Sequence, residues 1–454
     1  MTYSNSDTIA AICTAPGPAG LAAIRICGKE AIAIAEKIFS KPLKELPSHT
    51  AHYGKILDEK GRLIDKAMLL LLHSPKTYTG EETVEIFSHG GTIIPKKILE
   101  SLLQAGARAA RPGEFTLRAF LNGKIDLAQA EAVEERVASQ NEMALQASMD
   151  HLEGKLSKKI GAFQKELVAI GAILEAWVDF PEEDLAFATM EEICEKIICV
   201  IEQMQKLSYS FENGKRLKEG ATICLIGAPN VGKSSLMNHL LGKERAIVTS
   251  IAGTTRDTLE EDVIINKLPL RIIDTAGLRE TEELIEKEGI KRSKKAQKKA
   301  DLLLCIFDAC KGLSKEEKKI LADTNPEKTL YLFNKIDLLK ELPWEAKAFP
   351  YPFLAISAKE GTNCDLLMEE IQKRIFLSPV ERGEILLTSL RHKSHLDNAI
   401  SYCEKVVEGL KNDLSAEFVS SDMRKALQEL GYIIGMNVTE EILSSIFSKF
   451  CVGK

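Results

Sequence analysis

The stretch from Gly227 to Ser234 reads Gly-Ala-Pro-Asn-Val-Gly-Lys-Ser, and these residue types can bind phosphate. An apolar run at 221–226 precedes it, and Ser-Leu-Met-Asn-His-Leu-Leu follows as the expected start of a helix. Between a strand and a helix, loop amides and the helix N-terminus point at one anion. Gly232 lets the backbone approach that anion closely. We therefore predict a phosphate-binding loop in which Lys233 reaches the β- and γ-phosphates and Ser234 binds Mg²⁺. The alternative is a glycine turn that precedes a helix by chance.

Two further segments, each after an apolar run that is typical of a strand, have residues suited to a nucleotide. The run 270–273 ends at Asp274-Thr275-Ala276-Gly277, where a carboxylate can hold Mg²⁺ through water and an amide can meet a γ-phosphate. The run 329–333 ends at Asn334-Lys335-Ile336-Asp337. The carboxylate of Asp337 can accept two N–H bonds from guanine, whereas adenine offers no such pair of donors.

Two more segments complete the pattern. Gly253-Thr254-Thr255-Arg256-Asp257 follows the phosphate loop, and the strand-like run at 354–356 leads to Ser357-Ala358-Lys359, which suits the O6 of guanine. Five such motifs in this order predict a translation-factor-type GTPase. The predicted nucleotide-binding residues are Asn230, Val231, Gly232, Lys233, Ser234, Ser235, Thr249, Ser250, Ile251, Ala252, Gly253, Thr254, Thr255, Asp274, Thr275, Ala276, Gly277, Asn334, Lys335, Asp337, Ser357, Ala358 and Lys359.

The catalytic details differ from those of Ras-like proteins. Leu278 stands where a Ras-like protein has the glutamine that orients the attacking water, so another group must place the water. Glutamates at 280, 282, 283 and 286 follow closely, although a solvated acidic face is an alternative role for each of them. Asn230, with small residues at 249–254, could cage a monovalent cation that acts as an arginine finger does. Alternatively, Asn230 only braces the loop.

Length and composition limit the number of domains, the cellular compartment and the kinds of partner. A chain of 454 residues suggests about three domains. No apolar run approaches the roughly 20 residues of a membrane span, and the N-terminus lacks a secretory signal pattern. The ten cysteines show neither a close pair nor a metal-binding spacing, which favours reduced thiols in the cytoplasm. A net charge of −6 does not favour nucleic-acid binding, so contact with RNA would need a local basic patch or a partner protein.

The first 120 residues mix strands and helices, which predicts an α+β domain with its own core. Expected strands at 7–12 and 22–26 flank a turn at 15–20. A helix at 31–39, strands at 67–72 and 82–88, and a helix from His89 to Gln104 follow. The segment 111–124 is dense in turn-forming and charged residues, and by itself favours a surface loop with solvated side chains.

From Asp126, a plausible N-cap, helical periodicity is expected to continue to about 180, where Pro181 disfavours helix. Another helix is expected at 190–211, and a short polar link at 214–220 leads into the phosphate-loop strand. Alternating strands and helices over 216–376 predict a parallel α/β sheet. Helices at 389–410, 422–434 and 439–450 end the chain, with Thr439 as a candidate N-cap. We infer that the α/β domain is inserted into one helical bundle.

The basic run 287–299 contains Lys291, Arg292, Lys294, Lys295, Lys298 and Lys299. A solvated helix face is favoured over RNA binding for this run.

Taken together, these motifs resemble the MnmE (TrmE) family of bacterial tRNA-modification GTPases over essentially the whole length. The GTPase motifs alone would not separate this family from ribosome-assembly GTPases. The motifs outside the G domain that carry the resemblance are Pro16-Gly17-Pro18-Ala19-Gly20 with Arg25, Thr79-Gly80-Glu81 with Glu85, His89-Gly90-Gly91, Arg111-Pro112-Gly113-Glu114-Phe115 through Ala119-Phe120-Leu121-Asn122-Gly123-Lys124, and the terminal Cys-Val-Gly-Lys.

The resemblance implies a fold class and a domain plan. The fold is expected to be multidomain α+β and α/β, with a mostly parallel sheet in a Ras-like G domain. A tetrahydrofolate-binding and dimerisation domain is expected at 1–121. The helical domain is expected at 122–215 and 379–454, and the inserted G domain at 216–378. The motif Cys-Val-Gly-Lys ends the second helical half.

The resemblance also implies site residues. Arg25, Glu85, Lys124 and Lys454 match folate-contacting positions, which removes the surface-loop interpretation for Lys124. By the same match, Mg²⁺ is expected at Ser234 and Thr255, K⁺ at Asn230, Thr249, Ile251 and Thr254, and a water-orienting glutamate at Glu286. Cys451 matches a cysteine that is important for modification.

The implied activity is K⁺-dependent GTP hydrolysis, activated when the G domains of a homodimer meet. With the FAD protein MnmG (GidA), in a heterotetramer, the family modifies C5 of the wobble uridine of certain tRNAs. The addition is an aminomethyl or carboxymethylaminomethyl group, and its one-carbon unit comes from methylene-tetrahydrofolate. The implied ligands are GTP, Mg²⁺, K⁺ and 5-formyl- or 5,10-methylene-tetrahydrofolate. Two alternatives stay open, namely a slow switch that binds RNA or ribosomes, and a one-carbon transferase in which the G domain is only regulatory.

Overall fold

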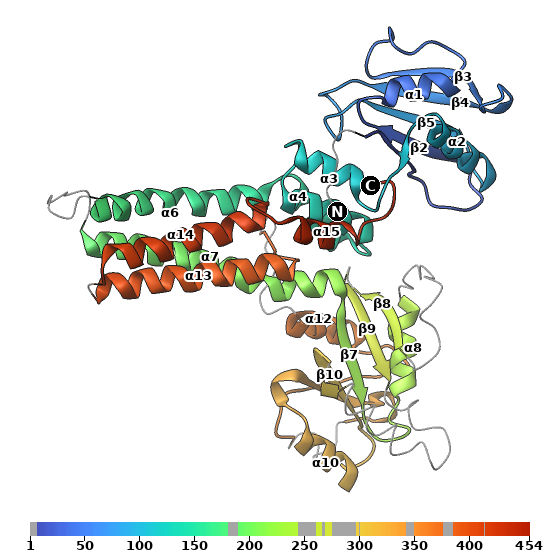
Figure 1. Ribbon diagram of the computed structural model, residues 1–454. Helices are drawn as coiled ribbons and strands as arrows, with labels where there is room; N and C mark the ends of the chain where they lie inside the picture. Colours follow the sequence, from blue (N-terminus) through green and yellow to red (C-terminus); the bar gives the residue numbers. More distant parts are fainter. Residues whose placement is uncertain are drawn as a thin grey trace, which may run out of the picture. The chain divides into compact units, whose positions relative to one another are not determined.

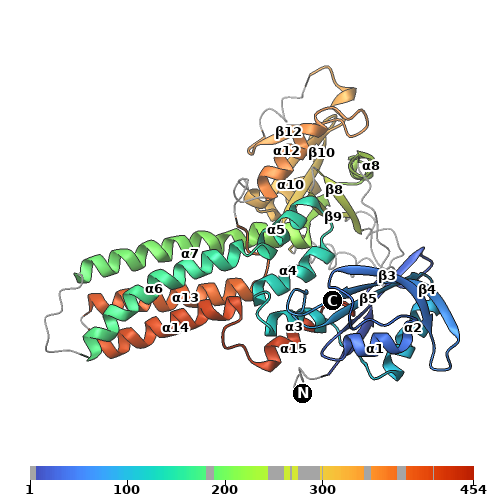
Figure 2. The same cartoon turned by 90° about the horizontal axis from the view of Figure 1, so that it is seen from above.

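The structure is a computed structural model that describes residues 7–179, 189–243, 260–265, 268–274, 297–298, 300–341, 349–375, 385–412 and 414–454. The chain forms two compact units (Figures 1 and 2). The first contains Met1–Ala138, Ser148–Met204 and Ser394–Lys454, and the second contains Ser139–Ala147 and Gln205–Lys393.

The first unit begins with a six-stranded sheet in the order β3-β4-β5-β2-β1-β6. All neighbours are antiparallel except β1 and β6. The strands are β1 (Ile9–Ile12), β2 (Leu21–Cys27), β3 (Thr50–Leu57), β4 (Leu63–Leu72), β5 (Thr83–His89) and β6 (Arg108–Ala109). Helices α1 (Ala31–Ile38) and α2 (Ile93–Gln104) share one hydrophobic core with alternate residues of these strands, so they cover one face of the sheet. The predicted α+β pattern is confirmed, but the helix expected from His89 begins only at Ile93, because His89 ends β5.

The prediction that 111–124 is a surface loop was wrong, because this segment contains helix α3 (Glu114–Leu121). Gly113 precedes the helix in the left-handed conformation (φ 66°), which favours glycine. The side chains of Glu114 and Arg118 are 4% and 2% exposed. Two ion pairs join Arg118 to Glu114 and to Asp7, at 3.3 and 2.7 Å, and Arg108 pairs with the same two carboxylates. Glu114 and Arg118, which were predicted to be solvated, are therefore buried together. This is possible because each has partners of opposite charge.

The helical segments of the first unit differ in length from the predicted ones. Asp126 caps α4 (Leu127–Ala138) as expected, since its Oδ1 accepts the amide N–H of Gln129 at 2.9 Å. The helical stretch that was predicted to run to about 180 is then interrupted before α5 (Glu142–Leu152) and again at Gly154, where φ is 76°. The remaining helices are α6 (Lys155–Asp179), α7 (Met190–Glu219), α13 (Leu390–Lys411), α14 (Ala416–Ile434) and α15 (Glu440–Phe447).

Helices from distant parts of the sequence pack together in this unit. Figures 1 and 2 both show α6, α7, α13 and α14 side by side. The hydroxyl of Ser420 on α14 donates to Glu175 on α6 at 2.5 Å, and Met423 faces Gly171 of α6. Thr439 caps α15, as predicted, by accepting the amide of Ile442.

The second unit contains the α/β sheet, in the order β12-β11-β10-β7-β9-β8. The first five strands are parallel and β8 is antiparallel to β9, so the predicted mostly parallel sheet is confirmed. The strands are β7 (Ala221–Ile226), β8 (Glu260–Ile265), β9 (Leu268–Asp274), β10 (Leu302–Asp308), β11 (Thr329–Asn334) and β12 (Phe353–Ala355). The central strand β10 is buried at every residue, because separate hydrophobic clusters cover its two faces. Helix α8 (Lys233–Lys243) lies between β7 and β8 in the chain, and α10 (Lys315–Asp323) lies between β10 and β11. Helix α12 (Cys364–Ile375) follows the last strand, β12.

The prediction of a polar link at 214–220 was wrong, because α7 continues through it to Glu219. Gly214 is a helix residue whose missing side chain lets the carbonyl of Leu387 approach, since a Cβ there would collide with that oxygen. The helix also runs through the expected domain boundary between 215 and 216. The domain boundaries stay a prediction.

None of the ten cysteines forms a disulfide in the structure. Among the described residues, we find no helix with the length and apolar character of a membrane span.

Candidate functional site

The described nucleotide-binding motifs meet at one edge of the parallel sheet. Strands β7, β10, β11 and β12 are neighbours and run in the same direction, so their carboxyl ends share that edge. The phosphate loop follows β7, Asn334 ends β11, and Ser357 lies just beyond β12. Ligands of open α/β sheets bind at this edge.

The phosphate loop has the backbone that its glycines predict. Gly232 has φ 100°, and Asn230 is left-handed with φ 64°, which a non-glycine residue rarely adopts. Lys233 is 5% exposed, and its Nζ donates to the carbonyls of Gly227 and Ala228 at 3.0 and 2.7 Å. Ser234 and Ser235 are exposed in the first turn of α8, where backbone amides and the helix dipole favour an anion.

Asn334 joins three motifs into one site. Its Nδ2 donates to the carbonyl of Val231 at 2.9 Å, and its Oδ1 accepts the amide N–H of Ala358, also at 2.9 Å. The side chain is 2% exposed, and a Cβ on Gly232 would collide with its Nδ2. The phosphate loop, the Asn-Lys-Ile-Asp motif and the Ser-Ala-Lys loop therefore hold one another in place.

Asp337, the predicted base-binding residue, is exposed. Its Oδ1 accepts a hydrogen bond from the hydroxyl of Ser357 at 2.6 Å. Ser357 is fully buried and also accepts the amide N–H of Glu360, so the Ser-Ala-Lys loop fixes the carboxylate. Lys359 is also exposed.

Sequence reasoning missed Asp308, the last residue of β10. It is 8% exposed, and its Oδ2 accepts a hydrogen bond from the Nζ of Lys335 at 2.7 Å. A signal was present in the sequence, because Asp308 ends an apolar strand as Asp274 and Asn334 do. Polar residues at the carboxyl end of a buried parallel strand point to the ligand edge.

The remaining predicted residues of this site lie outside the described residues. They are Thr249, Ser250, Ile251, Ala252, Gly253, Thr254, Thr255, Thr275, Ala276, Gly277 and Glu286, together with the side chain of Asp274. Of the basic run 287–299, only residues 297 and 298 are described.

A second group of predicted residues gathers on the sheet of the first unit. Arg25 and Glu85 are cross-strand partners on β2 and β5, and their side chains form an ion pair at 2.8 Å. The guanidinium also lies over the rings of Tyr78 and Phe115, at 5.9 and 5.4 Å from the centroids. The hydroxyls of Tyr78 and Thr116 are 3.0 Å apart. Neither aromatic residue was predicted, because a single Tyr or Phe gives no sign of its role in the sequence.

The segment 75–81 brings Lys124 to this group. The Nζ of Lys124 donates to the carbonyl of Pro75 at 2.8 Å, and its side chain packs beside Gly80. Tyr78 belongs to the same segment and contacts Arg25. The structure therefore links Lys124 to Arg25 through one short loop.

The C-terminal tail docks at the start of α3. The amides of Gly113 and Phe115 donate to the carbonyls of Cys451 and Lys454 at 3.4 and 3.3 Å. Gly453 has φ 99°, and a Cβ there would lie 2.7 Å from the carbonyl oxygen of Ile12. Because Phe115 also contacts Arg25, the tail lies beside the Arg25–Glu85 pair.

Two further cysteines lie near this group, and burial raises the pKa of both thiols. For Cys27 the pKa rises to about 11, so this thiol is protonated at neutral pH and is a poor nucleophile. Its Sγ contacts the hydroxyl of Thr79 at 2.9 Å and Glu81 at 3.3 Å. For Cys13, burial outweighs the opposing effect of the Arg25 charge. Cys451, by contrast, is exposed.

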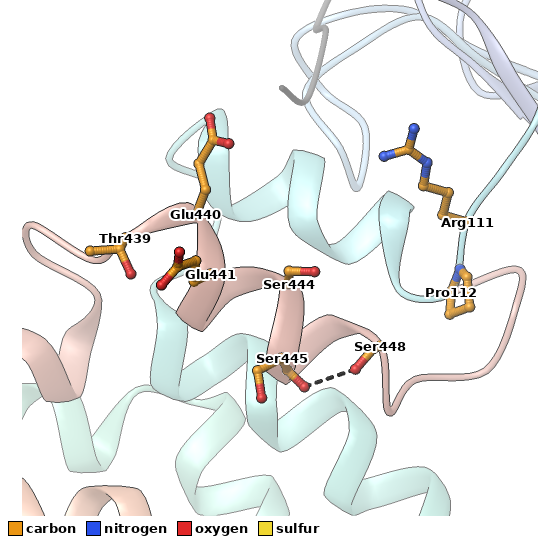
Figure 3. Close-up of a pocket in the computed structure, with 8 residues that line it drawn as sticks. All are labelled: Arg111, Pro112, Thr439, Glu440, Glu441, Ser444, Ser445 and Ser448. Carbon is orange, nitrogen blue, oxygen red and sulfur yellow. Dashed lines mark hydrogen bonds between the residues drawn. The ribbon is translucent and has the colours of Figure 1, made fainter. Parts of the chain in front are cut away.

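A surface hollow of about 960 Å³ lies next to the docked tail (Figure 3). Its lining residues are Arg111, Pro112, Thr439, Glu440, Glu441, Ser444, Ser445 and Ser448. The predicted site residues are not among them, so we do not assign the folate or the nucleotide to it.

Two family models match the chain. The model described as the MnmE helical domain matches residues 127–451, and the model described as the GTP-binding protein TrmE N-terminus matches residues 8–124.

Curated relatives match over their full length. The chain is 51% identical to the tRNA modification GTPase MnmE of Protochlamydia amoebophila, over 100% of this chain and 98% of the relative. It is 44% identical to the protein of the same name from Acetivibrio thermocellus, over 99% of both chains. The corresponding protein of Lachnoclostridium phytofermentans is 42% identical, over 99% of this chain and 100% of the relative.

Two solved structures each overlap with part of the chain. A crystal structure of Aquifex aeolicus Era bound to GDP.AlF4- is 26% identical, covers 40% of this chain and 66% of that one, and has a TM-score of 0.28. The G domain of the T. maritima FeoB iron transporter is 24% identical, covers 34% of this chain and 99% of that one, and has a TM-score of 0.27. Because these scores are low, we rest the family assignment on the full-length relatives.

Proposed function

Because the chain belongs to the MnmE family of tRNA modification GTPases, we propose that its GTP hydrolysis is K⁺-dependent, is activated by dimerisation, and serves the modification of C5 of the wobble uridine. The observation that carries this proposal is the 51% identity over the whole chain to such a GTPase. The proposed partners are tRNA and the flavoprotein MnmG, in a heterotetramer with the homodimer. The proposed location is the cytoplasm, where tRNA and GTP are available.

In the nucleotide site, the loop amides from Asn230 to Ser235 would bind the phosphates, and Asp337 would accept the N–H groups of guanine. The hydroxyl of Ser234 is exposed at the start of α8, which suits a hard cation beside the phosphates. Ser234 and Thr255 would hold Mg²⁺. Asn230, Thr249, Ile251 and Thr254 would hold K⁺, and Asn230 is exposed in the loop. The two cations would supply positive charge to the phosphoryl oxygens as negative charge develops there.

Glu286 is the residue that we propose to orient the attacking water, because Leu278 cannot form a hydrogen bond. Lys233 would move its ammonium from the loop carbonyls to the β- and γ-phosphates. The chain has no candidate for an arginine finger in the described part of this site, which is the reason why the caged cation matters in this proposal.

The proposed folate site is formed by Arg25, Glu85, Lys124 and Lys454. Its donor set fits the ligand, because a carboxylate can accept the N–H groups of a pterin ring and cations can pair with the carboxylates of the glutamate tail. The rings of Tyr78 and Phe115 flank Arg25 and can contact a flat ring system. When bound, the folate would supply the one-carbon unit. The docked tail would hold Cys451 at this site.

A homodimer is supported by an apolar sheet face. Tyr53 and Met68 are paired residues of β3 and β4 and are 62% and 49% exposed. Strand residues that alternate with them are buried against α1 and α2, so both side chains lie on the opposite face, as do Arg25 and Glu85. Exposed apolar side chains around a candidate binding site favour a partner that covers them.

Arg25→Met is expected to weaken the binding of 5-formyl-tetrahydrofolate by about tenfold or more, because a charged hydrogen-bonding group is lost. The binding can be measured by isothermal titration calorimetry of the full chain. Lys124→Met, at an exposed position, should also weaken binding without affecting folding. Arg62→Met is the matched control, since Arg62 forms an ion pair with Asp58 in the β3–β4 turn and is 73% exposed. Wild-type affinity in both Arg25→Met and Lys124→Met would contradict the proposed folate site.

A further inference from the structure

We propose that Asp308 is a positioning residue of the nucleotide site: it holds Lys335 against the phosphate loop and so slows nucleotide release. The inference rests on the proposed assignment of Lys335 and Asn230 to that site. The three residues lie at the ends of two adjacent strands, β10 and β11, and in the loop after β7.

The carboxylate of Asp308 is fixed at both oxygens. Its Oδ1 accepts the amide N–H of Cys310 at 3.0 Å, and its Oδ2 accepts from the Nζ of Lys335 at 2.7 Å. Asp308 is also paired in register with Asn334, the residue before Lys335, and the carbonyl of Asn334 accepts the amide N–H of Ala309. The carboxylate therefore has one position relative to the Asn-Lys-Ile-Asp motif.

The ammonium of Lys335 connects Asp308 to the phosphate loop. Besides Asp308, its Nζ donates to the carbonyl of Asn230 at 2.6 Å. Lys335 and Asn230 both have left-handed backbones, with φ of 71° and 64°. Left-handed backbone is uncommon in a long side-chain residue such as Lys335, and the hydrogen bond from its Nζ restrains the carbonyl of Asn230.

The negative charge of Asp308 keeps the ammonium of Lys335 in its contact with Asn230. Burial would raise the pKa of Asp308, but the hydrogen bonds from Lys335 and Cys310 and the charge of Lys335 hold it below its ordinary value. The carboxylate is therefore ionised at neutral pH. The Lys335 side chain is 30% exposed, so without this charge its ammonium could turn towards water and release the carbonyl of Asn230.

The test is the release rate of fluorescently labelled GDP from the full chain, with Asp308→Asn as the variant. Asparagine keeps the oxygen that accepts from Cys310 and removes only the charge facing Lys335. We expect about tenfold faster release, the effect of losing a charge-assisted hydrogen bond. Glu370→Gln is the matched control, because it removes a carboxylate that pairs with Arg374 on α12, and it should release GDP at the wild-type rate.

A double-mutant cycle separates positioning from a general loss of stability. In a Lys335→Met background, Asp308→Asn should have almost no further effect on release. The thermal unfolding midpoint of the single variant Asp308→Asn, measured without nucleotide, should stay close to that of Glu370→Gln. Unchanged release in Asp308→Asn, or an equal effect in both backgrounds, would overturn the inference. Neither result would affect the proposed function, whereas a wild-type chain that fails to bind GDP would overturn the nucleotide site itself.

Discussion

Asp337→Asn is expected to weaken GTP binding by about a hundredfold or more and to improve the binding of xanthosine triphosphate. In the proposed site the carboxylate would accept two N–H groups from guanine, while an asparagine amide would place its own N–H against one of them. Xanthine has a carbonyl at that position, so the same amide can donate to it. Ser357, which now donates to Asp337, can donate to the new amide oxygen as well, so the Ser-Ala-Lys loop should keep its place.

The measurement is competition of GTP and xanthosine triphosphate for labelled GDP on the full chain. Asp323→Asn serves as the control, because it neutralises an exposed carboxylate at the end of α10, away from the predicted base site. A variant with unchanged preference for GTP would show that another group recognises the base.

Glu286→Ala is expected to slow GTP hydrolysis by about a hundredfold or more, with little change in the affinity for GTP. A residue that orients the attacking water contributes to the transition state and not to the binding of the ground state. Single-turnover hydrolysis with enzyme in excess, measured together with GTP affinity, separates the two effects.

Neighbouring glutamates provide the control for this prediction. Glu282→Ala and Glu283→Ala remove carboxylates from the same acidic stretch and should hydrolyse GTP at near wild-type rates if those side chains are only solvated. Normal turnover in Glu286→Ala would remove Glu286 from the catalytic role, and slow turnover in all three variants would point to the charge of the whole stretch.

The G-domain motifs could be predicted from the sequence because each one combines a local pattern with a fixed chemical task. Gly232 is required by a left-handed backbone, and Asn334 follows an apolar strand, so residue type and position are both visible in the chain. By contrast, Asp308 was missed since its partner, Lys335, is brought to it only by the pairing of β10 with β11. A contact between residues far apart in the sequence leaves no local pattern.

Two errors in the predicted fold have the same physical origin. The segment 111–124 has the composition of a loop, but its charged residues are neutralised by partners distant in sequence, such as Asp7, so it forms a buried helix. Gly214 is usually unfavourable in a helix, but here it permits the close approach of Leu387. In both cases tertiary contacts override the local preference. For the proposed folate site, Arg25 and Glu85 came from the family resemblance, and the structure places Tyr78 and Phe115 beside Arg25.

The most direct test of the proposed mechanism is the rate of GTP hydrolysis in K⁺ compared with Na⁺, at matched ionic strength and at several protein concentrations. We predict at least about tenfold faster turnover in K⁺, because a caged cation replaces the missing arginine finger. The turnover per molecule in K⁺ should also rise with protein concentration, as two G domains meet. Equal rates in the two salts would contradict cation-assisted hydrolysis and the role of Asn230 in it, while the assignment of the chain to the GTPase family would stand.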